Sequence, residues 1–127
     1  MRLLLDTHVA LWAITDSPRL PAEVRRLLLA PANEVYVSAA SVWEISIKHS
    51  LGRRMPISGS QANAYFEEAG YVSLPVTAEH AALVETLPPH HSDPFDRLLV
   101  AQALAEPLRL ITHDDAVASY SDTVLLF

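Results

Sequence analysis

Four carboxylates stand far apart in the chain, each at a point where the predicted secondary structure changes. Asp6 ends the first apolar run, and Asp114 closely follows the apolar run 108–111. Glu44 and Asp96 lie near the starts of two predicted helices. In an open parallel α/β sheet, the carboxyl ends of the strands and the helix starts that follow them share one rim, where ligands bind. The spacing therefore predicts that these four side chains meet at one rim.

A rim of carboxylates favours a hard divalent cation. Carboxylates about 5 Å apart repel by roughly 3 kcal/mol per pair at an effective dielectric constant near 20. The chain has no cysteine and no H-E-x-x-H motif, which argues against a zinc site. Mg²⁺ or Mn²⁺ prefers oxygen ligands, keeps several waters and binds phosphate oxygens. Because such an ion can activate water, the pattern predicts metal-dependent hydrolysis of a phosphate ester.

Ordinary structural roles also account for each acid taken alone. Asp6 and Asp114 can cap the helices that follow them, since Asp is a favoured N-cap residue. Glu44 can pair with Lys48, the only lysine in the chain, one helical turn away. Both interpretations stay open at this point, because capping or pairing does not prevent a carboxylate from holding a metal.

The segment Asp93-Pro94-Phe95-Asp96 has the form of a helix start. Asp93 is the expected N-cap, with Pro94 at the favoured first helical position. Asp96 is explained less well, because Asp reaches back to the cap less readily than Glu does. Asp96 is therefore the stronger site candidate, and Asp93 is an accessory one.

Histidines and aromatic residues flank the acids. His90 and His91 are adjacent in a Pro-rich segment, so they point apart and are poorly placed to chelate a metal together. A solvent-exposed loop is the expected place of both, and contact of one of them with phosphate near the site is the alternative. Trp12, Trp43 and Phe95 fall within helical patterns. Core packing is the expected role of these three rings, and stacking on nucleic-acid bases is the alternative.

Composition bounds the class of protein. The 127 residues are half hydrophobic and suit a single domain, residues 1–127. The absence of cysteine excludes a disulfide scaffold and fits a cytoplasmic protein. No apolar run approaches the ~20 residues of a membrane span. A net charge of −6 counts against nucleic-acid binding, but bound cations would offset it, and eight of the nine basic residues are arginine, the better phosphate ligand.

Strand and helix patterns alternate along the chain. Runs of strand character, most of them apolar and unbroken, alternate with longer helical patterns, which indicates βαβ units and a mainly parallel sheet with helices on both faces. The fold class is therefore α/β, with three α/β/α layers. The expected strands are 2–5, 35–38, 71–74, 108–111 and 123–127, and the expected helices are 8–14, 21–29, 40–51, 61–69, 77–87, 93–105 and 114–118.

Four segments carry a resemblance to a known family. They are L-L-D-T-H at 4–8, S-V-W-E-I at 41–45, H-S-D-P-F-D-R at 91–97 and T-H-D at 112–114. Together, in this order and at these separations, they resemble the PIN-domain family, and in detail its VapC-type branch, the toxins of toxin–antitoxin pairs. Each segment alone is a modest signal, whereas the set of four is specific.

The resemblance implies a three-layer PIN-like domain and Mg²⁺- or Mn²⁺-dependent endoribonuclease activity. It implies that Asp6 and Asp96 are the principal metal ligands and that Glu44 and Asp114 complete the site. Thr112 resembles the hydroxyl residue beside the last acid, and the Thr-x-Asp spacing favours Asp114 over its neighbour in that role. The expected partners are an RNA substrate, a second copy of the chain in a homodimer, and a VapB-type antitoxin that covers the active-site groove.

Other classes fit the residues less well. A catalytically silent PIN-like module that binds RNA or partners is the main alternative, and the complete acid set argues against it. A receiver-like signalling domain needs a lysine at the end of its last strand, whereas Lys48 lies in a predicted helix. A phosphatase with an Asp nucleophile after the first strand needs a second acid where His8 stands.

Overall fold

The computed structural model describes all residues, 1–127. Its centre is one five-stranded sheet in which every strand pairing is parallel, in the order β3-β2-β1-β4-β5. The strands are β1 (Arg2–Leu5), β2 (Glu34–Ser38), β3 (Val72–Leu74), β4 (Arg109–Thr112) and β5 (Leu125–Leu126). The helices are α1 (Thr7–Ile14), α2 (Ala22–Leu29), α3 (Ala39–Ser50), α4 (Gly59–Glu68), α5 (Ala78–Leu83), α6 (Pro94–Ala105) and α7 (Asp115–Ala118), with a 3₁₀ turn over Val84–Thr86.

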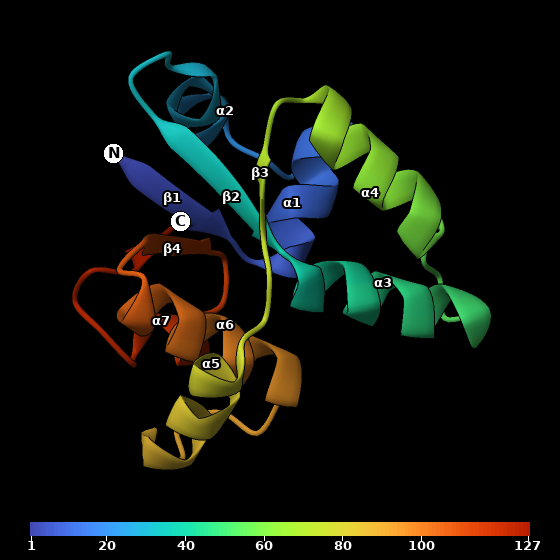
Figure 1. Cartoon of the computed structure of the whole chain (residues 1–127). Coiled ribbons are helices and arrows are strands. Elements are labelled where there is room, and N and C mark those ends of the chain that lie inside the picture. The colour runs from blue at the N-terminus through green and yellow to red at the C-terminus, as the bar shows by residue number, and fades with distance from the viewer.

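The central strand β1 is buried on both faces. Leu3, Leu4 and Leu5 have no solvent exposure. Leu3 and Leu5 point into a core shared with α1–α4, and Leu4 points into a second core shared with α6 and α7. Because side chains alternate along a strand, one unbroken apolar run supplies both faces of the sheet. The helices thus form layers on both sides of the sheet (Figure 1), which confirms the predicted three-layer α/β architecture.

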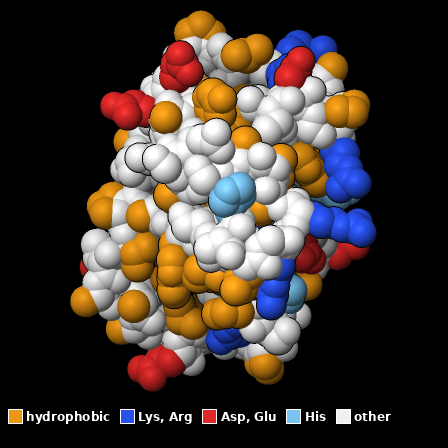
Figure 2. Space-filling model, turned by 90° about the vertical axis from the view of Figure 1, so that its right-hand side faces the viewer, with side chains coloured by type: hydrophobic (Ala, Val, Ile, Leu, Met, Phe, Trp, Pro, Cys, Tyr) orange, Lys and Arg blue, Asp and Glu red, His pale blue; other side chains and the backbone are white.

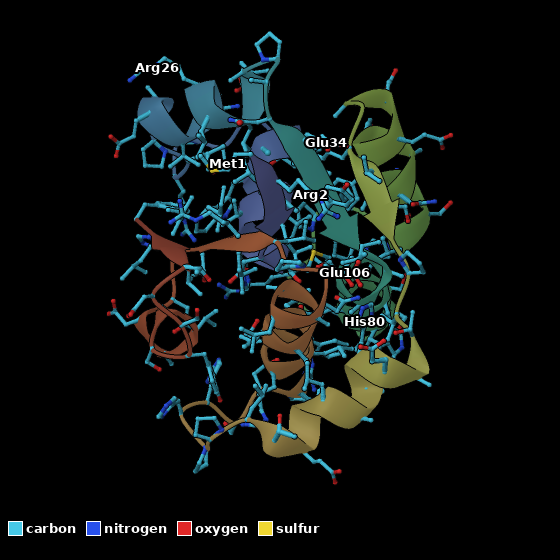
Figure 3. All side chains as sticks on the ribbon, turned by 60° about the vertical axis from the view of Figure 1, so that its left-hand side comes forward. Met1, Arg2, Arg26, Glu34, His80 and Glu106 are labelled. Carbon is cyan, nitrogen blue, oxygen red and sulfur yellow. The ribbon has the colours of Figure 1, made fainter.

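A polar contact of the buried His80 joins α5 to the end of α6. His80 is 2% exposed, and its Nε2 lies 2.6 Å from Glu106 Oε2 just after α6. Thr77 is the N-cap of α5, and its backbone N–H donates to His80 Nδ1. Figure 3 shows His80 and Glu106 pointing toward each other. This contact fixes α5 on α6, the helix that carries Asp96.

Several element boundaries differ from the expected ones by one residue, and four differences have a structural reason or are larger. The helix expected from 61 begins at Gly59, because Ser58 and Gln61 form a capping box. The helix expected over 77–87 changes to a 3₁₀ turn after Leu83. Pro21 is the N-cap of α2 and not its first residue, and the last strand is only two residues long.

Gly59 has a packing reason for being glycine. A Cβ at this position would lie 1.7 Å from Ser46 Oγ, so α4 can start this close to α3 only without a side chain there. Gly52 has a φ of +68° just after α3, which agrees with the predicted helix stop. No helix of the fold is both long and apolar enough for a membrane span.

Candidate metal centre and active site

Asp6 lies where β1 passes into α1, beside the start of the loop after β4. Its Oδ1 accepts a hydrogen bond of 3.0 Å from the His8 backbone N–H, so it caps α1 as one interpretation predicted. Its Oδ2 accepts a 2.6 Å hydrogen bond from Thr112 Oγ1. The side chain is almost fully buried, and burial raises the pKa of Asp6 against the opposing effect of the Thr112 hydrogen bond.

Thr112 and Asp114 bring the end of β4 to the same place. The Thr112 hydroxyl accepts from the Asp114 backbone N–H at 3.1 Å while it donates to Asp6. Asp114 also caps α7 through the Ala116 N–H, and its other oxygen is left for the rim. The order of the strands reverses between β1 and β4. Asp6 and Asp114 therefore lie at the topological switch point, the usual ligand site of an open parallel sheet.

Asp96 lies in the first turn of α6 and points toward this rim. Asp93 caps α6 by accepting from the Phe95 and Asp96 backbone N–H groups, as predicted. Asp96 does not reach back to the cap, and its Oδ2 lies 2.8 Å from His91 Nε2. Burial and the negative charges of Asp6 and Asp93 raise the pKa of Asp96 to about 7, although the His91 hydrogen bond opposes the shift.

Glu44 comes from α3 and is buried. It is 3% exposed, and Lys48 Nζ donates to its Oε2 at 2.6 Å, so the predicted ion pair is present. Its Oε1 has no hydrogen-bond partner. The charge of Glu44 nevertheless contributes to the raised pKa of both Asp6 and Asp96. The ion pair therefore leaves one buried oxygen free, on a carboxylate close to the other acids.

The rim encloses an open hollow of about 490 Å³. Asp6, Asp93, Asp96 and Asp114 line it, whereas Glu44 does not. The other lining residues are His8, Trp12, Arg19, His91 and His113. Thr112 is joined to this set by its hydrogen bond to Asp6, and Glu44 by its charge. The residues whose ligand atoms lie close enough together to share one ion are His91, Asp96 and Asp114, a group that includes neither Asp6 nor Glu44.

His91 joins the site through contacts with two of the acids that the sequence did not predict. We expected a solvent-exposed loop, but His91 is half-buried, and its Nε2 lies between Asp96 Oδ2 and Asp114 Oδ2, 3.4 Å from the latter. These three side chains offer ligand atoms within 4.8 Å of one another. His90 points elsewhere, with its ring against Tyr120. The two adjacent histidines do point apart, as expected, but one of them points into the site.

Arg97 holds the loop that places His91. Its guanidinium donates to backbone oxygens of Val84 at 3.1 Å and Pro88 at 3.0 Å, and to the Tyr120 hydroxyl at 3.0 Å. The same hydroxyl accepts from the His91 backbone N–H. The signal in the sequence was the arginine directly after Asp96, whose five donors suit a loop rich in unpaired carbonyls.

The aromatic residues divide between the two alternatives. The expectation of core packing is wrong for Trp43, which is 58% exposed and meets Phe95 edge-on at 5.0 Å between ring centroids. Trp12 is half-buried and packs partly against the core while also lining the hollow. Helical periodicity did not separate these cases, because the exposure of Trp43 depends on how α3 packs against the rest of the fold.

A comparison with known protein families shows to which family the chain belongs. The model of the PIN domain matches residues 3–122, nearly the whole chain. The chain belongs to the PIN-domain family. The comparison with curated proteins finds no match.

Solved structures show the same fold over the full length of this PIN domain. VapBC2 from Rickettsia felis, solved bound to a promoter DNA fragment, gives a TM-score of 0.71 at 18% identity, covering 100% of this chain and 98% of that one. VapBC-1 from nontypeable Haemophilus influenzae gives 0.66 at 21% identity, with coverages of 100% and 97%. FitAcB from Neisseria gonorrhoeae gives 0.63 at 23% identity, with coverages of 98% and 96%.

The donor set of this PIN domain fits a divalent cation. Burial, together with the neighbouring negative charges of Asp6 and Asp93, raises the pKa of Asp96 to about 7, and Glu44 Oε1 lacks any partner. A cation among the carboxylates would reduce their mutual repulsion and would give Glu44 Oε1 a partner. Carboxylate oxygens with one imidazole nitrogen and no thiolate are ligands that suit Mg²⁺ or Mn²⁺.

Proposed function

We propose that this PIN domain is a metal-dependent endoribonuclease and the toxin of a toxin–antitoxin pair. The observation that carries the proposal is the convergence of Asp6, Asp96 and Asp114 on one hollow at the switch point between β1 and β4, with the charge of Glu44 near enough to act on Asp96. Fold similarity to VapBC and FitAcB supports the toxin assignment. PIN-family membership supports nuclease chemistry.

Mg²⁺ or Mn²⁺ would be held principally by Asp6 and Asp96, with Glu44 and Asp114 completing the site directly or through water. When bound, the ion would supply a lowered pKa for the attacking water and charge neutralisation at the phosphodiester. Thr112 fixes the orientation of Asp6 by donating to Oδ2. Lys48 holds Glu44 by one oxygen and leaves the other free for the site.

Other side chains of the site can hold a proton or fix the position of a metal ligand. His91 Nε2 lies within hydrogen-bonding distance of Asp96 and close to Asp114, so it can hold a proton between two carboxylates that repel each other. Asp93 serves as an accessory residue: it caps α6 and thereby sets the position of Asp96. The open hollow would admit the backbone of a single-stranded or looped RNA, where the phosphate can approach the carboxylates.

The same acidic rim would be blocked by a basic antitoxin segment, since an arginine or lysine side chain matches its charge. The side of the molecule that carries α3 and α4 shows hydrophobic side chains gathered below its centre and basic ones along one edge (Figure 2). Trp43, Leu51 and Tyr65 are large exposed hydrophobic residues of this region. We assign such apolar surface to the antitoxin and to a second copy of the chain, in a homodimer that acts in the cytoplasm.

Cleavage of labelled total RNA by the antitoxin-free protein tests the proposal. Reactions with EDTA, Mg²⁺ or Mn²⁺ are compared for the wild type, Asp96→Asn and the exposed control Asp122→Asn. We expect discrete cuts that require metal and Asp96, with Asp122→Asn behaving as the wild type. Folded protein that cuts under no condition would instead favour the silent PIN-like module that binds RNA or partners without cleaving.

A further inference from the structure

One wall of the acidic hollow is built from side chains that the proposed metal site does not use. His8 and Trp12 come from one face of α1, one turn apart, with ring centroids 6.1 Å apart. His113, from the loop between β4 and α7, meets Trp12 nearly edge-on at 5.8 Å. We call His8, Trp12, Arg19 and His113 the aromatic wall; all four line the same hollow as the carboxylates.

The rings of the aromatic wall are accessible. His8 and His113 are exposed, and Trp12 is half-buried, packed partly against the core that α1 covers. The His8 imidazole makes no hydrogen bond or ion pair; its backbone N–H alone is used, in capping by Asp6. His113 Nδ1 contacts the Phe127 backbone oxygen and its ring lies 4.9 Å from the Phe127 ring, so this imidazole is anchored, whereas the His8 ring is free. Exposed rings beside the acidic rim offer flat surfaces on which another planar group can stack.

Arg19 supplies a cation that is not neutralised. Its guanidinium carbon lies 6.0 Å from the centre of the Trp12 ring, and its side chain forms no ion pair although four carboxylates line the same hollow. The other arginines near active elements are engaged: Arg25 pairs with Asp16, and Arg97 is enclosed by loop oxygens. Arg19 is therefore available for a phosphate group, for which guanidinium is the better ligand.

We propose that the aromatic wall binds the nucleotide next to the scissile phosphate, with the base stacked on its rings and a neighbouring phosphate held by Arg19. This inference rests on the proposed nuclease function, whose scissile phosphate lies at the carboxylates. Stacking tolerates any base, because every base has a flat π face. A base must be unpaired to reach such a wall, so the substrate at this position is single-stranded RNA.

The charge of the wall favours RNA over a basic protein segment at this position. Arg19 would repel an incoming arginine or lysine, whereas it attracts a phosphate backbone toward an otherwise acidic hollow. A local cation is also what a protein with a net charge of −6 needs in order to hold RNA next to its carboxylates. The aromatic wall thus binds the neighbouring nucleotide, and the carboxylates form the place where the scissile phosphate reacts.

Binding of a short fluorescein-labelled single-stranded RNA, measured by anisotropy in EDTA, tests Arg19 without requiring cleavage. The matched control is Arg26, an exposed arginine on α2 that does not line the acidic hollow and points away from the body of the molecule (Figure 3). Arg19→Ala should weaken binding by roughly five- to tenfold and lower the salt slope by about one. Arg26→Ala should bind as the wild type does.

Tryptophan fluorescence tests the stacking. The chain has two tryptophans, so a Trp43→Phe variant leaves Trp12 as the only one. Single-stranded RNA should quench its emission, and an abasic RNA of equal length should not. His8→Ala, which removes an exposed ring, should reduce this quenching and raise KM for cleavage while changing kcat little.

The outcomes separate this inference from the function on which it rests. If RNA binds through Arg19 and quenches Trp12 but no metal supports cleavage, the nuclease proposal fails and the subsite stands. If metal-dependent cleavage requires Asp96 but Arg19→Ala and Arg26→Ala bind alike, the nuclease stands and the subsite is overturned. Equal quenching by abasic RNA would also overturn it.

Discussion

The ammonium group of Lys48 lies 2.6 Å from Glu44 Oε2, one helical turn away on α3, while Glu44 Oε1 has no partner at all. The pair joins a half-exposed cation to a carboxylate that is 3% exposed. A buried carboxylate held by one oxygen is both stabilised in its charged form and left with a free ligand atom. The ion pair and the metal-site role are therefore compatible.

Lys48→Met should destabilise the metal-free protein, because it leaves the buried Glu44 charge uncompensated. The expected loss is on the order of 1–3 kcal/mol in urea unfolding, since Lys48 is partly exposed. Metal-dependent cleavage should largely persist. Adding Glu44→Gln to this variant should recover most of the stability. A double variant no more stable than Lys48→Met alone would contradict the assigned pairing.

Asp6→Asn should abolish cleavage and leave the fold intact. The amide keeps the shape of the side chain but removes a charge from the rim, so ligand strength falls and repulsion with Asp96 is relieved. Cleavage should fall by at least about a hundredfold, an expected loss of roughly 2.7 kcal/mol or more in transition-state stabilisation. Circular dichroism should be unchanged. A variant that cuts at the wild-type rate would remove Asp6 from the site.

Metal-free protein should become less stable as the pH rises from about 4 to about 7. The pKa of Asp96 is about 7 in the fold against an ordinary 3.8, so the folded state binds the proton more tightly than the unfolded state does. Such a group weakens the fold as it ionises, by up to roughly 4 kcal/mol above pH 7. Asp6 shifts in the same direction.

Urea unfolding in EDTA across this pH range measures the effect. Asp96→Asn should remove most of the decline, and Mn²⁺ should offset it in the wild type by favouring ionised carboxylates. A wild-type stability that rises between pH 4 and pH 7 would contradict the crowding of charge at this rim.

Arg97→Lys should loosen the loop that carries His91 and leave the helices in place. Lysine has one ammonium group where arginine has five donors in a planar fork, so it cannot satisfy Val84, Pro88 and Tyr120 together. We expect a stability loss of about 1–3 kcal/mol and faster hydrogen exchange over residues 87–92. Weaker Mn²⁺ binding should accompany it. Unchanged exchange in this loop would show that Arg97 does not hold it.

The strands and most caps were predictable because their signals are local. The apolar run of β1, the Asp93 cap before Pro94 and the Asp6 cap of α1 each depend on neighbours a few residues away. The four segments that resemble the PIN-domain family are likewise local in the sequence. Helix ends were predicted less well where a contact with another helix decides them, as at Gly59 against Ser46.

By itself the sequence determined the acid set, the parallel α/β architecture and the kind of cation that the acids suit, because residue type and hydrophobic period carry that information. Only the tertiary structure decided which other side chains contact the acids. Thr112 reaches Asp6 across 106 residues of chain, and Arg97 turns His91 into the site through a loop of backbone carbonyls. Such contacts arise from the order of the strands and the packing of the helices, and no pattern of neighbouring residues records them.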